Sequence, residues 1–309
     1  MGTVDYSDMS VDRSDFYNHT LAYFEGNEPD PKNLKFVLSH PSGGNLFRDA
    51  IWLGDLVRIN DTDIRLSGFK FNLSWGADRM DLCKLVISEK TGFINTGRIS
   101  KTEDVPMKYL DGNDEVMMYS GLLNESRETG NPKGDGYIYL YGFRNHDGFK
   151  KNLMVARTLP KNFDKVSKWE YFNGEEWVEG IENANTKDAH ISKENVSSEL
   201  SVTRMTSGMF KNKYMLIYTD ATMSPYIKMA VSNKPEGPFT NAEFIYYCPE
   251  MDKYKAMGDE GIYTYNTKAH PHLSKKGELL ISYNVNSTSN FNENTYRYYP
   301  QFIKMYEIK

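Results

Sequence analysis

The chain has 309 residues, of which 39% are hydrophobic and 26% are charged, so its composition excludes a disordered or collagen-like protein. No apolar run reaches the roughly 18 residues of a membrane-spanning helix, and a net charge of −5 excludes a basic surface for nucleic acid. Aromatic residues make up 14% of the chain and alanine occurs only 11 times, which favours strands over helices. The composition therefore predicts an all-β protein without membrane or nucleic-acid partners.

Residues 1–16 are acidic and polar, without the basic and apolar regions of a signal peptide, so none is expected in the chain as written. Cys83 and Cys248 are far apart, and we interpret them as two buried free thiols. The sequence contains no CxxC or HxxxH spacing, so we predict neither a metal nor a cofactor.

Strand-like runs follow one another along the whole chain. Two early runs, 16–26 and 35–40, precede a pattern that recurs four times at intervals of about 65 to 75 residues. Each recurrence has a first run, a turn, a second run of apolar residues and a third run that often ends at Pro or Gly. The last recurrence places its first run at 267–274, and the polar stretch 183–194 reads as a loop between recurrences.

Antiparallel strands repeated at this period are typical of a β-propeller, whose blades bury their faces only against neighbouring blades. An irregular β-sandwich is the alternative. We predict one domain, residues 1–309, forming a five-bladed propeller whose first blade is incomplete. The predicted blades cover 1–47 in part, 48–110, 115–180, 197–250 and 262–309.

The order of several motifs resembles two families of uncharacterised domains, the domain-of-unknown-function families 4185 and 5005. The motifs that carry the resemblance are, in chain order, Asn18-HTLA, FRDAIWLGDLV (47–57), DGYIYLYGFRN (135–145), LMVAR (153–157), ELSVTRM (199–205), KPEGPF (234–239), KAHPHLS (268–274) and ISYNVN (281–286). The resemblance implies a five-bladed propeller related to arabinanases, sucrases and fructosidases. Some relatives of the first family are endo-acting arabinanases that cleave D-arabinan, which implies a secreted or cell-envelope protein acting on carbohydrate. Separately, the high Asn, Lys and Tyr content with low Ala indicates a bacterium with an AT-rich genome.

The start of the chain departs from the family pattern. Such chains normally open with a strand pair that ends in an acidic Gly-Asp or Ser-Asp element, and Met1 would fall just after that element. The catalytic acid of the first blade then has no counterpart here, so we expect weak hydrolysis by the chain as given.

Glycoside hydrolysis needs two carboxyl groups, and the resembled families supply them from different blades. We predict Asp55 and Glu199 as the catalytic pair, because each lies in the first strand of its blade. The alternatives are a ladder-capping role for Asp55 and a solvent-facing position for Glu199. We expect Asp55, Glu199 and His270 to share one axial funnel.

Carbohydrate binding uses aromatic rings, planar amides, guanidinium groups and imidazoles. The predicted binding residues are His19, Asp49, Trp52, Arg204, His270, Asn284, Asn286 and Arg297. Most aromatic residues of a propeller fill the core, and His270 has a structural alternative. Two functions follow: a glycoside hydrolase acting on an arabinan-like or other polysaccharide, and a non-catalytic carbohydrate-binding propeller without the full acid pair.

Overall fold

The structure is a computed structural model in which most of the chain after residue 50 is described. The described ranges are 4–5, 10–11, 21–24, 34–37, 51–71, 77–87, 94–102, 108–146, 150–184, 191–192, 194–289 and 300–306. The chain forms two compact units: an N-terminal unit, Tyr17–Lys193, and a C-terminal unit, Glu194–Lys309 together with Met1–Phe16. None of the helices in the described ranges combines the length and apolar character needed to cross a membrane.

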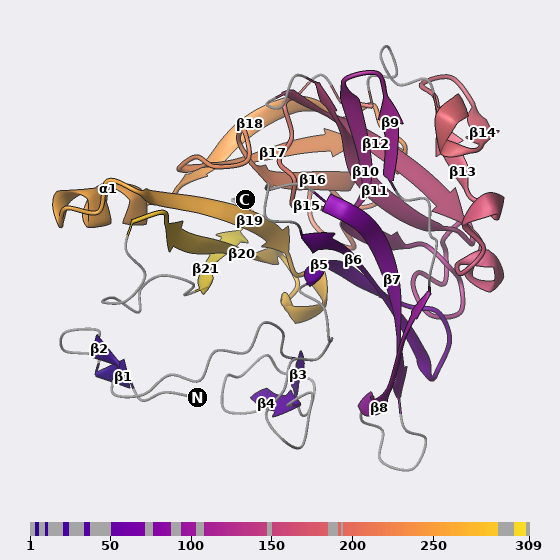
Figure 1. Ribbon diagram of the computed structural model, residues 1–309, viewed down its shortest axis with the longest axis horizontal. Coiled ribbons are helices and arrows are strands. Elements are labelled where there is room, and N and C mark those ends of the chain that lie inside the picture. The colour runs from indigo at the N-terminus through magenta and orange to yellow at the C-terminus, as the bar shows by residue number, and fades with distance from the viewer. Residues whose placement is uncertain are drawn as a thin grey trace. The chain divides into compact units, whose positions relative to one another are not determined.

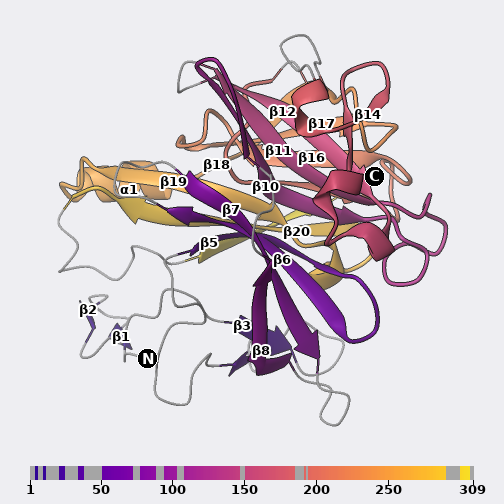
Figure 2. The ribbon, with the colours of Figure 1, turned by 45° about the vertical axis from the view of Figure 1, so that its right-hand side comes forward.

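The N-terminal unit consists of antiparallel sheets whose strands are neighbours in chain order (Figure 1). A two-stranded pair comprises β3 (Leu21–Phe24) and β4 (Leu34–Val37). A four-stranded sheet comprises β5 (Ile51–Arg58), β6 (Asp63–Phe71), β7 (Ala77–Ile87) and β8 (Ile94–Thr102). A six-stranded sheet comprises β9 (Lys108–Asp111), β10 (Asp114–Asn124), β11 (Ile138–His146), β12 (Lys150–Thr158), β13 (Glu170–Phe172) and β14 (Trp177–Glu179), the central strands of which are clear in Figure 2.

The C-terminal unit has the same meander topology. One sheet comprises β15 (Leu200–Arg204), β16 (Tyr214–Thr219), β17 (Tyr226–Ser232) and β18 (Thr240–Tyr247). The next comprises β19 (Ile262–Ala269), β20 (Glu278–Ser287) and β21 (Pro300–Tyr306), and a small pair comprises β1 (Val4–Asp5) and β2 (Ser10–Val11). Helix α1 (Glu250–Ala256) joins the two larger sheets. Short 3-10 helices are η2 (Pro160–Asn162), η3 (Val166–Lys168), η4 (Ile181–Asn183) and η5 (Pro271–Leu273).

Alternating side chains build the core of the C-terminal unit. On β20 the side chains of Leu279, Ile281, Tyr283 and Val285 are buried. The residues that alternate with them, Leu280, Ser282 and Asn284, are only partly buried. Because successive side chains of a strand point to opposite faces, one face of β20 packs against the core. That core also contains the thiol of Cys248. Burial raises the pKa of this thiol to about 12.

A charged cluster holds the β9–β10 hairpin of the N-terminal unit. The guanidinium of Arg144, 2% exposed, donates to Asp114 at 2.8 Å and to Asp111 at 2.7 Å. His146 Nδ1 lies 2.9 Å from the same Asp114 carboxylate. The hydrogen bond from Arg144 lowers the pKa of Asp114 below its usual value. These contacts give the hairpin tip a defined position on β11.

The predicted fold class, an all-β protein of antiparallel propeller-type sheets, is confirmed. The first early run contains β3 and the second overlaps β4, and the predicted second strand of every recurrence is a strand: β6, β11, β16 and β20. The count of five blades and the single domain stay predictions.

Candidate functional site

The strand register aligns four residues, one from each strand, towards one end of the β15–β18 sheet. Leu200 pairs with Tyr218, Tyr218 with Lys228, and Lys228 with Phe244. Directly paired residues of antiparallel strands point to the same face of a sheet. This row of residues crosses all four strands immediately beside Glu199, and we call it the Glu199 end of the sheet.

The start of β15 is fixed against the end of β19 within the C-terminal unit. The ammonium group of Lys268 donates a 2.8 Å hydrogen bond to the carbonyl of Leu200. The backbone N–H of Ala269 donates another, also 2.8 Å, to the hydroxyl of Ser201. Two such bonds at successive residues leave these two strand ends little freedom to separate.

The two bonds run in the same chain direction, Leu200 with Lys268 and Ser201 with Ala269, so Glu199 lies just before the first bond and His270 just after the second. His270 Nε2 and the Ser282 hydroxyl lie 2.7 Å apart, within hydrogen-bond distance. Glu199 and the His270 side chain are both partly buried. That the Glu199 carboxyl group and the His270 imidazole share one site stays a prediction.

The segment that carries His270 is a turn, which corrects the prediction of a strand over 267–274. Strand β19 ends at Ala269, and Pro271–Leu273 form the 3-10 helix η5. Pro271 lacks an N–H and cannot continue the ladder. The hydroxyl of Ser274 donates to the His270 carbonyl and accepts from the N–H of Leu280, both at 2.7–2.8 Å. The turn therefore holds the His270 ring near β20.

A second polar cluster at the Glu199 end was not predicted from the sequence. The ammonium of Lys228 lies 3.0 Å from Asp220 and 3.6 Å from Glu194, and the buried Tyr218 hydroxyl donates to Glu194 at 3.2 Å. Burial, followed by the charge of Glu194, raises the pKa of Tyr218. Glu194 falls in a stretch predicted as a loop and Asp220 was not predicted, although Tyr-Thr-Asp at the end of an apolar strand was the available signal.

Asp55 belongs to the N-terminal unit and joins two of its sheets. One carboxylate oxygen accepts from the N–H of Leu56 at 2.8 Å, and the other accepts from the N–H of Leu122 in β10 at 2.9 Å. The hydroxyl of Ser67 also accepts from the Asp55 N–H. Asp55 therefore has the ladder-capping contacts that were the alternative to a catalytic role, and its shared funnel with the C-terminal residues stays a prediction.

The remaining predicted binding residues are spread over the molecule. Trp52 is an exposed residue of β5. Arg204 lies at the far end of β15 and donates to the side chain of Asn212 at 3.1 Å. Asn284 is partly buried on β20, and Asn286 is buried with its side-chain oxygen accepting from the N–H of Ser287. The predicted residues His19, Asp49 and Arg297 lie outside the described residues.

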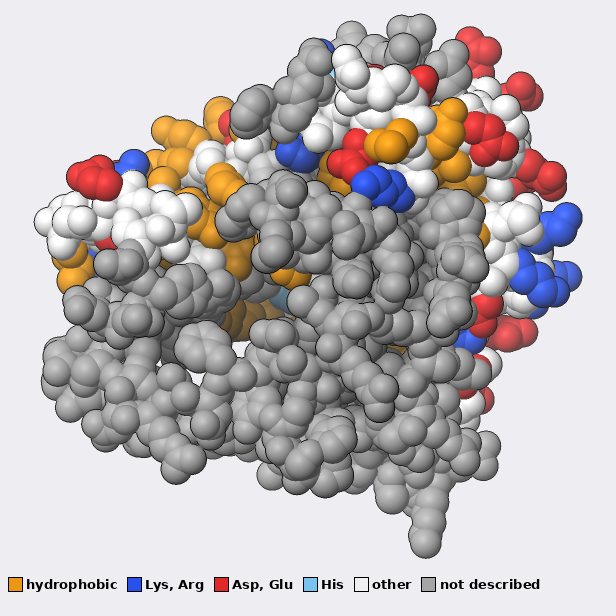
Figure 3. Space-filling view, viewed as in Figure 1, with side chains coloured by type: hydrophobic (Ala, Val, Ile, Leu, Met, Phe, Trp, Pro, Cys, Tyr) orange, Lys and Arg blue, Asp and Glu red, His pale blue; other side chains and the backbone are white. Residues whose placement is uncertain are grey.

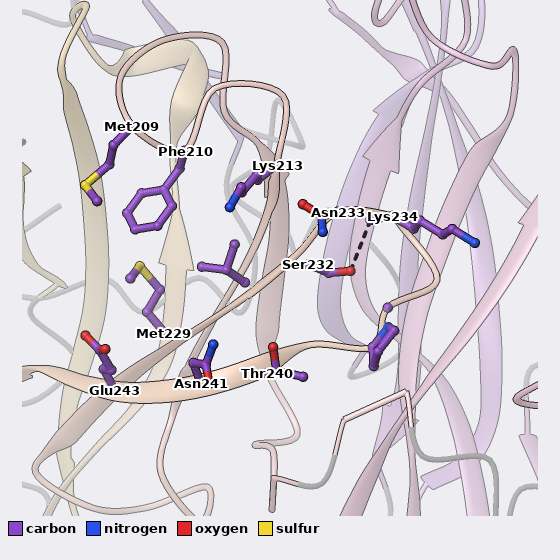
Figure 4. Close-up of a pocket in the computed structure, with 13 residues that line it drawn as sticks. Met209, Phe210, Lys213, Met229, Ser232, Asn233, Lys234, Thr240, Asn241 and Glu243 are labelled. Atoms are coloured by element: carbon purple, nitrogen blue, oxygen red, sulfur yellow. Dashed lines mark hydrogen bonds between the residues drawn. The ribbon is translucent and has the colours of Figure 1, made fainter.

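A cavity of the C-terminal unit lies towards the opposite end of the β15–β18 sheet (Figure 4). It has a volume of about 640 Å³ and is lined by the β15–β16 loop with Met209 and Phe210, the end of β17, and the start of β18. Its lining extends to Met229 and Glu243, each of which is next in its strand to a member of the row that crosses the Glu199 end. Across the ranges that the structure describes, no group of three or more His, Cys, Asp or Glu side chains could hold a metal ion.

Solved structures with a similar fold include a Bacteroides ovatus protein provisionally assigned as a hydrolase. Its TM-score is 0.54 at 21% identity, and the match covers 82% of this chain but only 60% of the length of that protein. A GH43_1 enzyme from Xanthomonas citri, complexed with xylotriose, has a TM-score of 0.47 at 10% identity, covering 97% of this chain and 81% of the enzyme. A Bombyx mori GH32 β-fructofuranosidase has a TM-score of 0.38 at 10% identity, covering 76% and 42%.

No curated protein matches the chain. The model of the family described as "Domain of unknown function (DUF5005)" matches residues 113–308, which is more than half of the sequence. The chain therefore belongs to the DUF5005 family.

Proposed function

We propose that this protein is a glycoside hydrolase-like propeller that cleaves an arabinan-like or other polysaccharide through axial carboxylates. The observation that carries the proposal is the pair of hydrogen bonds that fixes the start of β15 against the end of β19. These bonds tie together the two strand ends that carry Glu199 and His270, and we infer that the two side chains face one site. Membership of the DUF5005 family is compatible with this function but does not define it.

The proposed roles follow from the chemistry of glycosidic bonds. One carboxyl group protonates the leaving oxygen while a second acts as nucleophile or base. Glu199 is the proposed general acid and Asp55 the proposed second carboxylate. His270, oriented by Ser282, would hydrogen-bond to substrate hydroxyl groups, and Asn284 would extend this polar surface along β20.

One observation favours the alternative function, a propeller that binds carbohydrate without cleaving it. Both carboxylate oxygens of Asp55 accept backbone N–H groups, which is the arrangement of a structural aspartate. If Asp55 serves only this purpose, Glu199 lacks its catalytic partner. Binding would then continue through the hydroxyl, amide and imidazole groups.

The test is hydrolysis of arabinan-type polysaccharides by the wild type and by Glu199→Gln. Loss of general-acid assistance should lower turnover by about 10²–10⁴-fold. Glu260→Gln is the matched control, because Glu260 is an exposed glutamate of the same unit and should not affect turnover. Equal turnover by wild type and Glu199→Gln would contradict the assignment of Glu199. Sugar binding without turnover by the wild type would favour the binding function.

A further inference from the structure

Three aromatic side chains of the outer strands β17 and β18 are exposed on one face of the sheet. Tyr226 is 43% exposed, Phe244 61% and Tyr247 39%. Tyr226 pairs directly with Tyr247, and Phe244 pairs with Lys228, which is two residues from Tyr226 on the same strand. All three rings therefore point to the same side of the two strands. In Figure 3 hydrophobic side chains gather on the visible surface at the left, where β17, β18 and α1 lie in Figure 1.

Mutual contacts hold the three rings in place. The ring centres of Tyr226 and Phe244 are 5.1 Å apart, and those of Tyr226 and Tyr247 are 5.4 Å apart. The hydroxyl of Tyr247 donates a 2.6 Å hydrogen bond to Asp252, and this bond is the main reason that the pKa of Tyr247 rises to about 12. Rings fixed by their neighbours lose little side-chain entropy when a ligand packs on them.

The cluster is continuous with the Glu199 end of the sheet. The ammonium of Lys228 lies 4.8 Å from the centre of the Phe244 ring and 3.0 Å from Asp220. Lys228 thus connects the aromatic rings to the polar cluster, and the paired row leads on through Tyr218 to Leu200, the residue after Glu199. Strand spacings of about 4.8 Å place the Tyr226 ring on β17 roughly 10 Å from β15 and the two rings on β18 roughly 14 Å from it.

The composition of the surface indicates the class of ligand. Exposed rings offer apolar faces to the C–H faces of a sugar, while adjoining hydroxyl, carboxylate and ammonium groups can bond its hydroxyls. These rings are 39% to 61% exposed, so packing within the protein core does not account for their positions. The roughly 10–14 Å between the rings and β15 is longer than one sugar unit, so only a chain of several units could occupy both positions.

We propose that Tyr226, Phe244 and Tyr247 form an outer platform that binds a polysaccharide chain several sugar units away from Glu199. The proposal rests on the proposed function and specifies its substrate as a polymer rather than a short glycoside. The platform is a binding surface and takes no part in bond cleavage. Lys228 positions the Phe244 ring relative to the Glu199 end.

The experiment compares a Tyr226→Ala/Phe244→Ala double variant with a Phe302→Ala/Tyr306→Ala control. Phe302 and Tyr306 are aromatic side chains of β21, and they are 59% and 61% exposed. Affinity for soluble arabinan-type polysaccharide is measured by affinity electrophoresis in a Glu199→Gln background, and KM and kcat are measured with polymer and with a short aryl glycoside. Circular dichroism melting checks that each variant is folded.

The platform variant should bind polymer about tenfold more weakly and show a correspondingly higher KM for polymer. Its KM for the short glycoside, and the behaviour of the control variant, should match the wild type. Unchanged polymer affinity in a folded platform variant would overturn the platform alone, since the wild type would still bind sugar. Self-association of the wild type that the platform variant abolishes, with polymer affinity unchanged, would overturn it in favour of a protein contact. Absence of both polymer binding and turnover in the wild type would overturn the proposed function and the platform together.

Discussion

At the scale of single residues, Asp55 is the clearest case of a side chain whose contacts and proposed chemistry compete. Its two carboxylate oxygens bond to N–H groups on two strands, β5 and β10. A residue that joins two sheets in this way is needed for stability whether or not it also contacts substrate. The two effects can be separated by measuring folding and turnover on the same variants.

We expect Asp55→Ala to lower the free energy of unfolding by about 2–3 kcal/mol, because two backbone donors lose a charged acceptor. Asp55→Asn keeps one acceptor oxygen and should have a smaller effect. Asp61→Ala is the control, because the Asp61 side chain is 99% exposed, and it should change stability by less than about 0.5 kcal/mol. Urea unfolding at neutral pH measures all three, and an unchanged midpoint for Asp55→Ala would contradict the ladder-capping role.

Arg144 gives a prediction with a defined pH dependence. Arg144→Met should destabilise the protein by about 3 kcal/mol at pH 7, because it leaves the carboxylates of Asp111 and Asp114 without their buried partner. The pKa of Asp114 is lowered in the folded state, so its contribution is present above the unfolded value of about 3.9 and is lost as the pH falls through the lower folded value.

The difference in unfolding free energy between wild type and Arg144→Met should therefore be full near pH 7 and shrink below about pH 4. Urea unfolding across pH 3 to 7 measures this difference. A gap that stays constant down to pH 3 would show that the Asp114 ion pair is not its source.

At the scale of elements, β5 and β10 approach so closely that Gly54 has no room for a side chain. A Cβ atom at Gly54 would lie 2.1 Å from the carbonyl oxygen of Tyr119 and 2.7 Å from the Ser67 hydroxyl. Gly54→Ala should therefore cost about 3 kcal/mol, since backbone must move to accommodate it. Gly112→Ala is a useful comparison, because Gly112 faces open space with φ of +63° and should cost only about 1 kcal/mol. Similar melting temperatures for the two variants would contradict the close approach.

The length and burial of each strand or helix determined whether it could be predicted from the sequence. Strands such as β11 and β16 carry long apolar runs because both faces are buried, and these runs are visible in the sequence. Helix α1 was not predicted because it has only seven residues and buries only Met251 and Tyr254. Two buried residues are too few to show a helical period. Strands β9 and β14 are likewise too short to show alternation.

The candidate site was only partly predictable for a different reason. Glu199 and His270 were proposed from their positions at predicted strand ends, and in the structure they flank strands β15 and β19, which two hydrogen bonds join. The cluster of Glu194, Asp220 and Lys228 depends on the register between β16 and β17, which a single sequence does not specify. Similarly, the two N–H partners of Asp55 depend on backbone geometry, which the sequence pattern does not predict.

At the scale of the whole molecule, the number of thermal unfolding transitions tests whether the two compact units unfold together as the predicted single domain. If all blades close one ring, each unit depends on the other for burial of its outer sheets, and unfolding should be cooperative. We expect one calorimetric transition whose calorimetric and van't Hoff enthalpies agree. Two resolved transitions, or a ratio well above one, would contradict the single-domain prediction.

The buried thiol of Cys248 offers a way to observe the C-terminal core directly. Only a thiolate reacts readily with alkylating reagents, and burial both shields this sulfur and raises its pKa to about 12. In a Cys83→Ser variant, labelling should therefore proceed only through the rare openings that admit solvent to the sheets around Cys248. The rate of labelling then measures how often the C-terminal core opens under native conditions, so Cys248 is a built-in probe of local unfolding.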